Sequence, residues 1–398
     1  MKPWIERGPA AGGGGDPCTH ALVVGVSRYE FLTEDGSPGP GGRETFGLQQ
    51  VKTPATSAFL FARWLESTYR CPVAPLGTIR LLLSPSEWEE ENVPDLGDIP
   101  VEAIPATRAN VEEAVSEWFA ACSTNADHVA ILYASGHGIQ MSPDDGGIVL
   151  LEDFARFPSV LDFSLDVGAV RKGMAGPTMA QRQFYFVDAC RVRPEAALRF
   201  QTLGSGVGLP NPFAGTARVS AVYFAATPST EALGAPGKGT LFVQALVECL
   251  DTALGVDDHV QPDRTWAVTA TTLVSALPKR VRELAEAFGA EQTATTGGQL
   301  EDVPFHTLEG KPQVPIAVGL APDGAAAVAL GRLFDPQAGD LFEGEAFAPT
   351  IAREVPAGNY LLEVRLQPPT PPFKDVSTFV VPALPPAYAE TLTVAEDQ

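Results

Sequence analysis

Two residues of this chain, His137 and Cys190, have side chains that together could cleave an amide bond. Each follows an apolar run that predicts a buried strand: residues 128–134 precede Ser-Gly-His-Gly, and residues 183–187 precede Asp-Ala-Cys-Arg. If the two strands are parallel, the imidazole and the thiol meet at one edge of the sheet. A nearby imidazole favours the nucleophilic thiolate and can later protonate a leaving amine. The two residues therefore predict cysteine-protease chemistry.

The pattern around these strands predicts an α/β fold with a mainly parallel central sheet covered by helices on both faces. Short β-branched runs at residues 21–26 and 78–83 predict two further strands, and a helical stripe lies between them. Asn110 and Glu113 predict a capping box for a second helix, which starts near Asn110. A hairpin is expected at residues 144–151. The catalytic residues then fall at the carboxyl ends of strands, where open α/β sheets place their sites. The apolar stripes of the two helices are Phe59, Leu60, Trp64 and Leu65, and Val111, Ala114, Val115, Trp118 and Phe119.

The remainder of the chain predicts a tail and a second domain. Residues 1–17 contain four consecutive glycines and are expected to be a mobile tail. Residues 18–309 are expected to form the domain with the parallel sheet. After residue 310, short alternating runs separated by Pro and Gly turns predict a C-terminal all-β, sandwich-like domain over residues 310–398. Those runs are residues 314–318, 326–330, 352–355, 360–364 and 378–381.

Composition excludes several classes of function. The formal net charge of −22 argues against a nucleic-acid partner, which would need a basic surface. No apolar run approaches the length of a membrane helix or of a signal peptide, so a cytoplasmic protein without a membrane partner is expected. The five cysteines are scattered and include no Cys-x-x-Cys pair, so neither disulfides nor a zinc site is predicted. We expect no cofactor and no metal, although a calcium requirement stays open.

The two motifs resemble the catalytic signatures of clan CD peptidases, the group of caspases, metacaspases and bacterial caspase-like proteins. His137 lies 53 residues before Cys190, and in caspases the catalytic histidine likewise lies about 50 residues before the cysteine. Residues 21–29 resemble the opening strand of that family, residues 220–228 the strand that begins its small-subunit half, and residues 239–246 the next helix. The chain departs from the family at residues 53–58, where relatives usually carry Asn-Asp-Ala. The resemblance implies a caspase-hemoglobinase sandwich and a peptidase C14, metacaspase-like cysteine endopeptidase with catalytic His137 and Cys190.

The resemblance also implies roles for neighbouring residues. The backbone N–H groups of Gly138 and Cys190 would form the oxyanion hole, although Gly138 could instead merely permit a turn. Asp188, two residues before the cysteine, would bind Arg or Lys at P1, the substrate residue before the cut. Arg28 lies near the place where caspases hold a substrate aspartate, so it is the alternative P1 receptor, or else a plain surface arginine.

Partners and regulation follow from the same resemblance. A protein substrate is expected, with an activating protease or a regulatory protein as a further partner and a bacterial defence or cell-death pathway as the setting. Residues 191–218 predict a long loop with basic sites at Arg193, Arg199 and Arg218. The loop is either a regulatory segment or a passive connection. The rival to an active protease is a catalytically silent scaffold that acts through the C-terminal module. A serine hydrolase is disfavoured, since no Gly-x-Ser-x-Gly elbow follows a strand.

Overall fold

The computed structural model divides the chain into two compact units. The first comprises Met1–Val247 and Leu273–Phe305, and the second comprises Glu248–Thr272 and His306–Gln398. The domain limits expected from the sequence, 18–309 and 310–398, remain a prediction. The structure describes residues 2–7, 15–39, 45, 47–93, 104–140, 146–156, 161–191, 205–210, 217–227, 232–235, 237–257, 266–347, 350–367 and 373–396.

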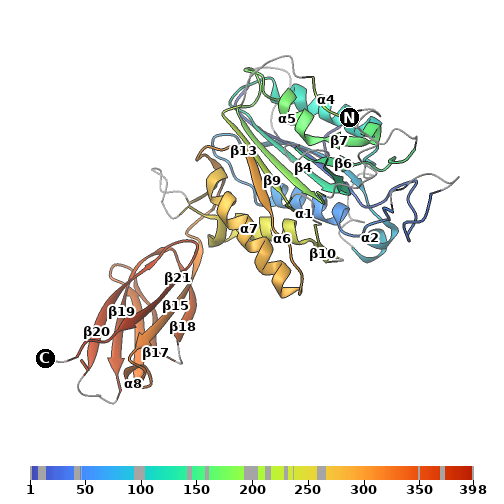
Figure 1. The fold of residues 1–398 in the computed structure, drawn as a ribbon. Coiled ribbons are helices and arrows are strands. Elements are labelled where there is room, and N and C mark those ends of the chain that lie inside the picture. The colour runs from blue at the N-terminus through green and yellow to red at the C-terminus, as the bar shows by residue number, and fades with distance from the viewer. Residues whose placement is uncertain are drawn as a thin grey trace. The chain divides into compact units, whose positions relative to one another are not determined.

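The first unit is built on a seven-stranded sheet with the order β1-β3-β2-β4-β8-β9-β13 (Figure 1). The five strands from β3 to β9 pair in parallel, and the two edge strands, β1 and β13, run antiparallel to their neighbours. The predicted, mainly parallel sheet is therefore confirmed. The strands are β1 (Ile5–Glu6), β2 (Thr19–Val26), β3 (Leu76–Ser84), β4 (Val129–Gly136), β8 (Arg182–Ala189), β9 (Val219–Phe224) and β13 (Thr295–Gln299).

Helices cover both faces of this sheet. Every residue of β2, β3 and β4 is buried, as strands require when both faces are covered. Figure 1 shows α4 and α5 on one side of the sheet and α1, α6 and α7 on the other. The helices are α1 (Pro54–Ser67), α2 (Glu87–Asn92), α4 (Arg108–Cys122), α5 (Val167–Gly173), α6 (Leu241–Asp251) and α7 (Ala270–Ala287).

Two cores hold these layers together. On the α1 face, the Phe61 ring stacks on Tyr133 of β4 with ring centroids 4.8 Å apart, and Phe186 of β8 stacks on Tyr223 at 5.2 Å. On the opposite face, Trp118 of α4 is fully buried, and its indole N–H donates to the His20 carbonyl at 2.9 Å. The central strands β2, β4 and β8 are thus packed from both sides, which gives the sheet the rigidity that a positioned site requires.

Short strands surround the carboxyl edge of the sheet. A three-stranded sheet contains β5 (Gly138–Ile139), β6 (Ile148–Leu150) and β7 (Ser164–Asp166), and a hairpin contains β10 (Gly234–Ala235) and β11 (Gly239–Thr240). β6 matches the second strand of the hairpin that was predicted at residues 144–151. Its partner is β5 at residues 138–139, while residues 141–145 lie outside the described residues. Two further strands are β12 (Ala267–Thr269) and β14 (Pro304–Thr307).

The predicted capping box at Asn110 is wrong. α4 begins one turn earlier, with Thr107 at the N-cap, and Asn110 lies inside the helix, where its amide donates to the Pro105 carbonyl at 2.9 Å. The Arg108 N–H donates instead to the Asp153 carboxylate at 3.0 Å. A tertiary contact therefore caps this helix. Among the described helices, α2 has a capping box, between Ser86 and Glu89.

Part of the predicted tail belongs to the sheet. Ile5 and Glu6 pair with Ile79 and Thr78 of β3, and the backbone N–H groups of Trp4 and Arg7 donate to carbonyls of the same strand. Residues 4–7 therefore cover the edge of β3, which would otherwise leave its hydrogen-bonding groups unpaired. Residues 8–14 lie outside the described residues.

The second unit contains the expected β-sandwich. One sheet has the order β18-β15-β21, and the other has the order β17-β16-β19-β20. Gly331 of β16 faces Ile351 of β18 so closely that a Cβ on Gly331 would lie 2.6 Å from the Ile351 side chain, so the two sheets pack face to face. The elements are β15 (Gln313–Ala321), α8 (Asp323–Ala326), β16 (Ala329–Asp335), β17 (Gly339–Ala346), β18 (Thr350–Pro356), β19 (Gly358–Leu366), β20 (Val376–Ala383) and β21 (Tyr388–Thr393).

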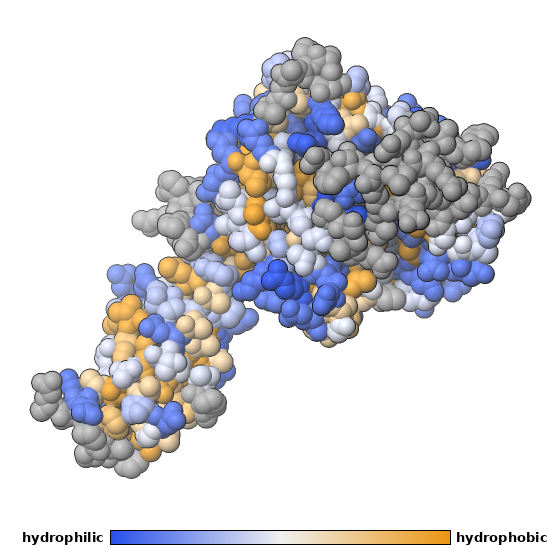
Figure 2. Space-filling model, in the orientation of Figure 1, coloured by the Kyte–Doolittle hydropathy of each residue, from blue (hydrophilic) through white to orange (hydrophobic). Residues whose placement is uncertain are grey.

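The strand pattern of this unit is only partly as predicted. The expected run at residues 326–330 begins too early, because α8 occupies residues 323–326 before β16 starts. β17 and β21 were not predicted, since most of their residues are exposed and give no alternating apolar signal. Apolar side chains also remain on the surface of this unit, where Figure 2 shows orange patches among blue ones. They include Leu341, Val376 and Val380, the last 63% exposed.

Candidate active site

Strand register places His137 and Cys190 side by side. Gly136, the last residue of β4, pairs in register with Ala189, the last residue of β8. His137 and Cys190 are the next residue along each strand, at the carboxyl edge of the sheet. Open α/β sheets place their ligand sites at this edge. The structure thus brings together the two residues that the sequence singled out.

His137 is held at two points. Its backbone N–H donates to the Tyr29 hydroxyl at 2.8 Å, and its ring Nε2 lies 2.6 Å from the Gln49 carbonyl oxygen. A carbonyl can only accept, so Nε2 carries the proton and the lone pair of the neutral ring is on Nδ1. Burial lowers the pKa of His137, and the bond to the Gln49 carbonyl opposes that shift. The imidazole is therefore mostly neutral near pH 7 and can accept a proton.

Backbone groups surround the Cys190 thiol. The Ala232 N–H donates to Cys190 Sγ at 3.3 Å, and the Ala232 carbonyl lies 4.0 Å from the same sulfur. On the other side, a Cβ on Gly138 would lie 2.1 Å from the Cys190 carbonyl oxygen. Only glycine permits this close approach. As a result, the backbone of Gly138 lies directly beside the backbone of Cys190.

Asp188 lies in the sheet beneath the thiol, only 1% exposed. Its Oδ2 accepts hydrogen bonds of 2.5 Å from the hydroxyls of Tyr133 and Thr240. Burial raises the pKa of Asp188 to about 6, while the hydroxyls of Thr240, Tyr133 and Ser135 act in the opposite direction. Among the residues that the structure describes, neither Asp188 Oδ1 nor Ser135 Oγ makes a hydrogen bond of ordinary geometry, although the Ser135 hydroxyl lies near enough to the carboxylate to lower its pKa. A buried carboxylate oxygen without a donor marks a place for a polar or charged group.

The β10–β11 hairpin contacts Asp188, and the residue two before it, Ala232, contacts the Cys190 thiol. Thr240 of β11 donates its hydroxyl to Asp188, and its backbone N–H donates to Ser57 Oγ of α1 at 2.8 Å. Before β10, the Leu233 N–H donates at 2.8 Å to the side-chain oxygen of Gln292, which is itself buried. The segment beside the Cys190 sulfur is thus tied to the core at both of its ends.

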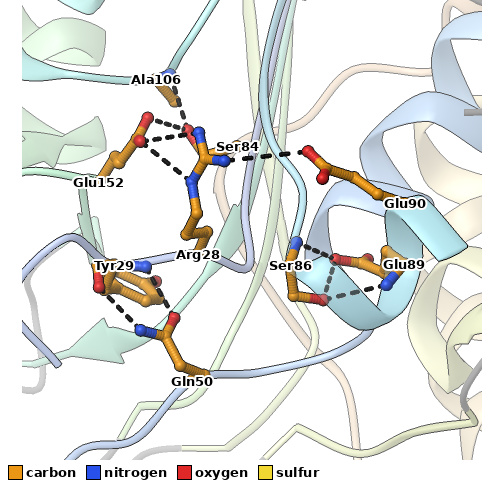
Figure 3. A network of polar contacts seen from close by, with 9 residues as sticks. All are labelled: Arg28, Tyr29, Gln50, Ser84, Ser86, Glu89, Glu90, Ala106 and Glu152. Carbon is orange, nitrogen blue, oxygen red and sulfur yellow. Dashed lines mark hydrogen bonds and ion pairs between the residues drawn. The ribbon is translucent and has the colours of Figure 1, made fainter. Parts of the chain in front are cut away.

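Arg28 lies in a different set of contacts. Its Nε and Nη2 donate to Glu152 Oε1 at 3.2 and 3.0 Å, and its Nη1 lies 3.8 Å from Glu90 (Figure 3). The second oxygen of Glu152 accepts from Ser84 at the end of β3. Among the described residues, Arg28 contacts neither Asp188 nor Cys190. The structure therefore places it in an ion-pair network that ties the ends of β2 and β3 to the segment after β6.

Arg191, next to the thiol residue, points to the opposite face of the sheet. Its guanidinium lies 4.1 Å above the Phe224 ring and donates to Thr295 of β13 at 3.1 Å. The side chain is 5% exposed, and burial lowers the pKa of Arg191. It thus anchors the chain directly after Cys190 to the edge of the sheet, and the cation–π contact contributes to that anchor.

The predicted loop at residues 191–218 is only partly described. Val207 pairs with Leu165 of β7 and is 4% exposed, so this part of the segment packs on the body of the unit. Arg218 forms an ion pair with Glu301 and is 62% exposed. Arg193 and Arg199 lie outside the described residues.

Sequence patterns did not predict several residues that shape the site. The Gln49 carbonyl belongs to a loop and carries no residue-type signal. Tyr29 and Thr240 lie within segments that resemble family motifs, yet nothing in their spacing indicated that they reach His137 and Asp188.

Within the described part of the chain, no cluster of three or more His, Cys, Asp or Glu side chains could hold a metal ion. In the same part of the chain, every helix is too short or too polar to cross a membrane.

Comparisons with known proteins give one family match and one structural likeness. A family model described as the caspase domain matches residues 19–293. No curated protein matches the chain. Among solved structures, the chain is similar to the crystal structure of caspase-1 from Spodoptera frugiperda, with 13% sequence identity and a TM-score of 0.40. That match covers 77% of this chain and 95% of the caspase-1 chain.

Proposed function

The chain belongs to the caspase-domain family, and from that premise we propose that it is a cysteine endopeptidase with a dyad of His137 and Cys190. The observation that carries the proposal is the register of β4 and β8, which sets the imidazole and the thiol on adjacent strand ends. Protein substrates follow from peptidase activity.

In the proposed reaction, Nδ1 of His137 takes the thiol proton, and the Cys190 thiolate attacks the scissile carbonyl carbon. The new C–S bond forms as the carbonyl becomes an oxyanion. When the C–N bond breaks, the His137 imidazolium gives its proton to the leaving amine. Water then hydrolyses the thioester and regenerates the thiol. The Gln49 carbonyl supports this cycle because it accepts from Nε2 in both the neutral and the protonated ring.

The oxyanion is proposed to bind the backbone N–H groups of Gly138 and Cys190. The close approach of Gly138 to the Cys190 carbonyl supports this role, since it brings the two backbones together. Donors fixed in advance act on charge that appears only in the transition state, where they contribute most.

We propose that the substrate is cut after Arg or Lys and that Asp188 binds this P1 cation. Support comes from the buried Oδ1 that lacks a donor, two residues from the nucleophile. A cation bound beside Asp188 would stabilise the ionised carboxylate and so offset the effect of burial, which raises the pKa of this group. Arg28, the alternative receptor for an acidic P1 residue, is already paired with Glu152 and Glu90.

The biological setting is proposed from family resemblance and from composition. We propose a regulated effector in the cytoplasm, acting in a bacterial defence or cell-death pathway and activated by a protease or a regulatory protein. The high content of Gly and Pro, 38 and 36 residues, is compatible with a GC-rich bacterial genome.

Selective alkylation tests the dyad without a known substrate. Wild-type protein is treated with limiting iodoacetamide, and the modified cysteines are identified by mass spectrometry. We expect Cys190 to react first, His137→Ala to abolish that preference, and Cys190→Ala to leave no fast-reacting thiol. Equal labelling of Cys190 and the half-buried Cys18 in wild type would favour the scaffold interpretation instead. Cleavage-site profiling in a denatured proteome then identifies the P1 residue.

A further inference from the structure

His137 depends on two segments of the chain, one that contains Tyr29 and one that contains Gln49. Tyr29, in the turn after β2, accepts from its backbone, and Gln49, in the segment before α1, accepts from its ring. Neither segment is a helix or strand at that point. The imidazole stays in place only if the two segments keep a constant position relative to each other.

We propose that the side chain of Gln50 is the positioning element that joins these two segments and so sets the orientation of His137. This inference rests on the proposed role of His137 as the catalytic base. Gln50 Oε1 accepts from the Tyr29 N–H at 2.8 Å, and Nε2 donates to the Tyr29 carbonyl at 2.8 Å (Figure 3). The same Nε2 also donates to the Leu32 carbonyl at 3.0 Å. One amide thus binds the turn through both of its donors and its acceptor.

The backbone bonds between the same segments are longer. The Gln50 N–H donates to the Thr33 carbonyl at 3.3 Å, and the Val51 N–H donates to the Ser27 carbonyl at 3.2 Å. The side chain of Gln50 therefore supplies the shortest contacts described between the turn and the segment that carries the Gln49 carbonyl. Because Gln49 and Gln50 are consecutive, any shift of Gln50 moves that carbonyl.

The ion pair of Arg28 also holds this turn, but we expect it to contribute less than Gln50 to fixing the position of the turn. The Arg28 side chain is 42% exposed, and exposed ion pairs contribute little because water screens them. The Gln50 amide is half-buried, and its loss would leave the Tyr29 N–H and the Leu32 carbonyl without this partner, while the Tyr29 carbonyl would keep only the 3.3 Å bond from the Leu32 N–H.

Gln181 provides a matched control. Its amide also makes three bonds to backbone groups, donating to the carbonyls of Gly176 and Met179 and accepting from the Arg218 N–H. It precedes β8 and therefore lies at the opposite end of the sheet from Cys190. Gln50→Met and Gln181→Met each keep the length of the side chain and remove all three bonds.

The test measures the rate at which iodoacetamide alkylates Cys190 between about pH 5 and pH 9. We expect Gln50→Met to lower that rate about tenfold, because a displaced base no longer assists the thiol, while Gln181→Met changes it less than about twofold. The acid limb of the Gln50→Met profile should also move to higher pH, because a thiol without a nearby imidazole ionises closer to its ordinary pKa. Equal rates for the two variants would overturn the proposal.

A second variant covers the case in which Gln50→Met does not fold. Gln50→Glu keeps the acceptor for the Tyr29 N–H and removes only the two donors, so a decrease in the same direction is expected, and a wild-type rate would overturn the proposal. Failure of the proposed function looks different. In that case wild-type Cys190 is not alkylated preferentially, whereas failure of the present inference leaves wild type reactive and Gln50→Met equally so.

Discussion

The hydroxyl of Tyr29 accepts a hydrogen bond from the backbone N–H of His137 at 2.8 Å and lies 3.3 Å from the Val26 carbonyl, to which it donates. The ring is 1% exposed, and burial raises the pKa of Tyr29 far above its ordinary value. This neutral hydroxyl therefore joins the end of β2 to the residue after β4. It acts on the backbone of the proposed base, whereas the Gln49 carbonyl acts on its ring.

Replacing Tyr29 with Phe should weaken both the fold and the reaction. The variant leaves the His137 N–H without its partner, which costs about 1–3 kcal/mol of unfolding free energy. Peptide cleavage should fall severalfold through kcat, with KM nearly unchanged, because the substrate does not contact this hydroxyl. Urea unfolding and steady-state kinetics measure the two effects. Tyr185→Phe, which removes a buried hydroxyl bonded to Gln183, serves as the control and should lower stability only. Wild-type kcat in Tyr29→Phe would contradict the expectation.

Replacing Asp188 with Asn should remove the preference for a basic P1 residue. The substrate cation would lose its charged partner, which costs about 2 kcal/mol or more of transition-state binding free energy. The value of kcat/KM for Arg and Lys peptides should fall accordingly. Alkylation of Cys190 by iodoacetamide should change little, since the reagent carries no cation. Arg28→Gln is the companion variant and should leave P1 preference intact. Cleavage after Asp in wild type, lost in Arg28→Gln, would exchange the proposed roles of the two residues.

The pKa of Asp188 should produce opposite pH trends in stability and activity. The pKa is about 6 in the folded chain and 3.8 for the unperturbed group, so the folded state binds the proton more tightly. The ionised form then destabilises the fold at pH 7, by on the order of 3 kcal/mol, and this penalty disappears as pH falls from about 7 toward 4. Cleavage after a basic residue should instead fall as pH drops through about 6, when Asp188 loses its charge.

Two comparisons isolate this carboxyl group from all others. The pH dependence of the unfolding free energy in wild type is set against that of Asp188→Asn, which cannot titrate at this position. The difference between the two curves should grow as pH rises from about 4 to about 6 and become constant near pH 7. Parallel curves would show that Asp188 titrates near its ordinary value, which would remove this support for a cation-binding site.

The arginines of residues 191–218 test whether this segment regulates the enzyme. If cleavage at Arg193, Arg199 or Arg218 activates the protein, changing all three to Gln should block both chain cleavage and the rise in activity after exposure to the native activator or a co-encoded protease. Intact mass and peptide hydrolysis report the two events. Because Arg218 is paired with Glu301, we expect cleavage there to be slower than at the other two sites. Normal activation of an uncut triple variant would make the segment a connector.

Local sequence patterns were sufficient to predict the central strands β2, β3, β4 and β8, their order along the chain and the ends at which His137 and Cys190 lie. Strands buried on both faces consist of continuous apolar runs, and the polar residue after such a run is visible in the sequence itself. The β-sandwich was predicted on the same basis, from short alternating runs with Pro and Gly turns. The mistake at Asn110 shows the limit of local patterns, since a carboxylate from a distant segment, Asp153, caps that helix.

The tertiary structure alone decided how the site is held. The Gln49 carbonyl fixes the tautomer of His137, yet a backbone oxygen has the same chemistry in every residue and leaves no pattern to find. Gln50 binds the Tyr29 turn, and Thr240 binds Asp188 from 52 residues away, only because the fold brings these segments together. The raised pKa of Asp188 likewise follows from burial by strands and helices distant in sequence. Residue types and spacing thus determined which groups could react, while packing between remote segments determined their orientation and charge.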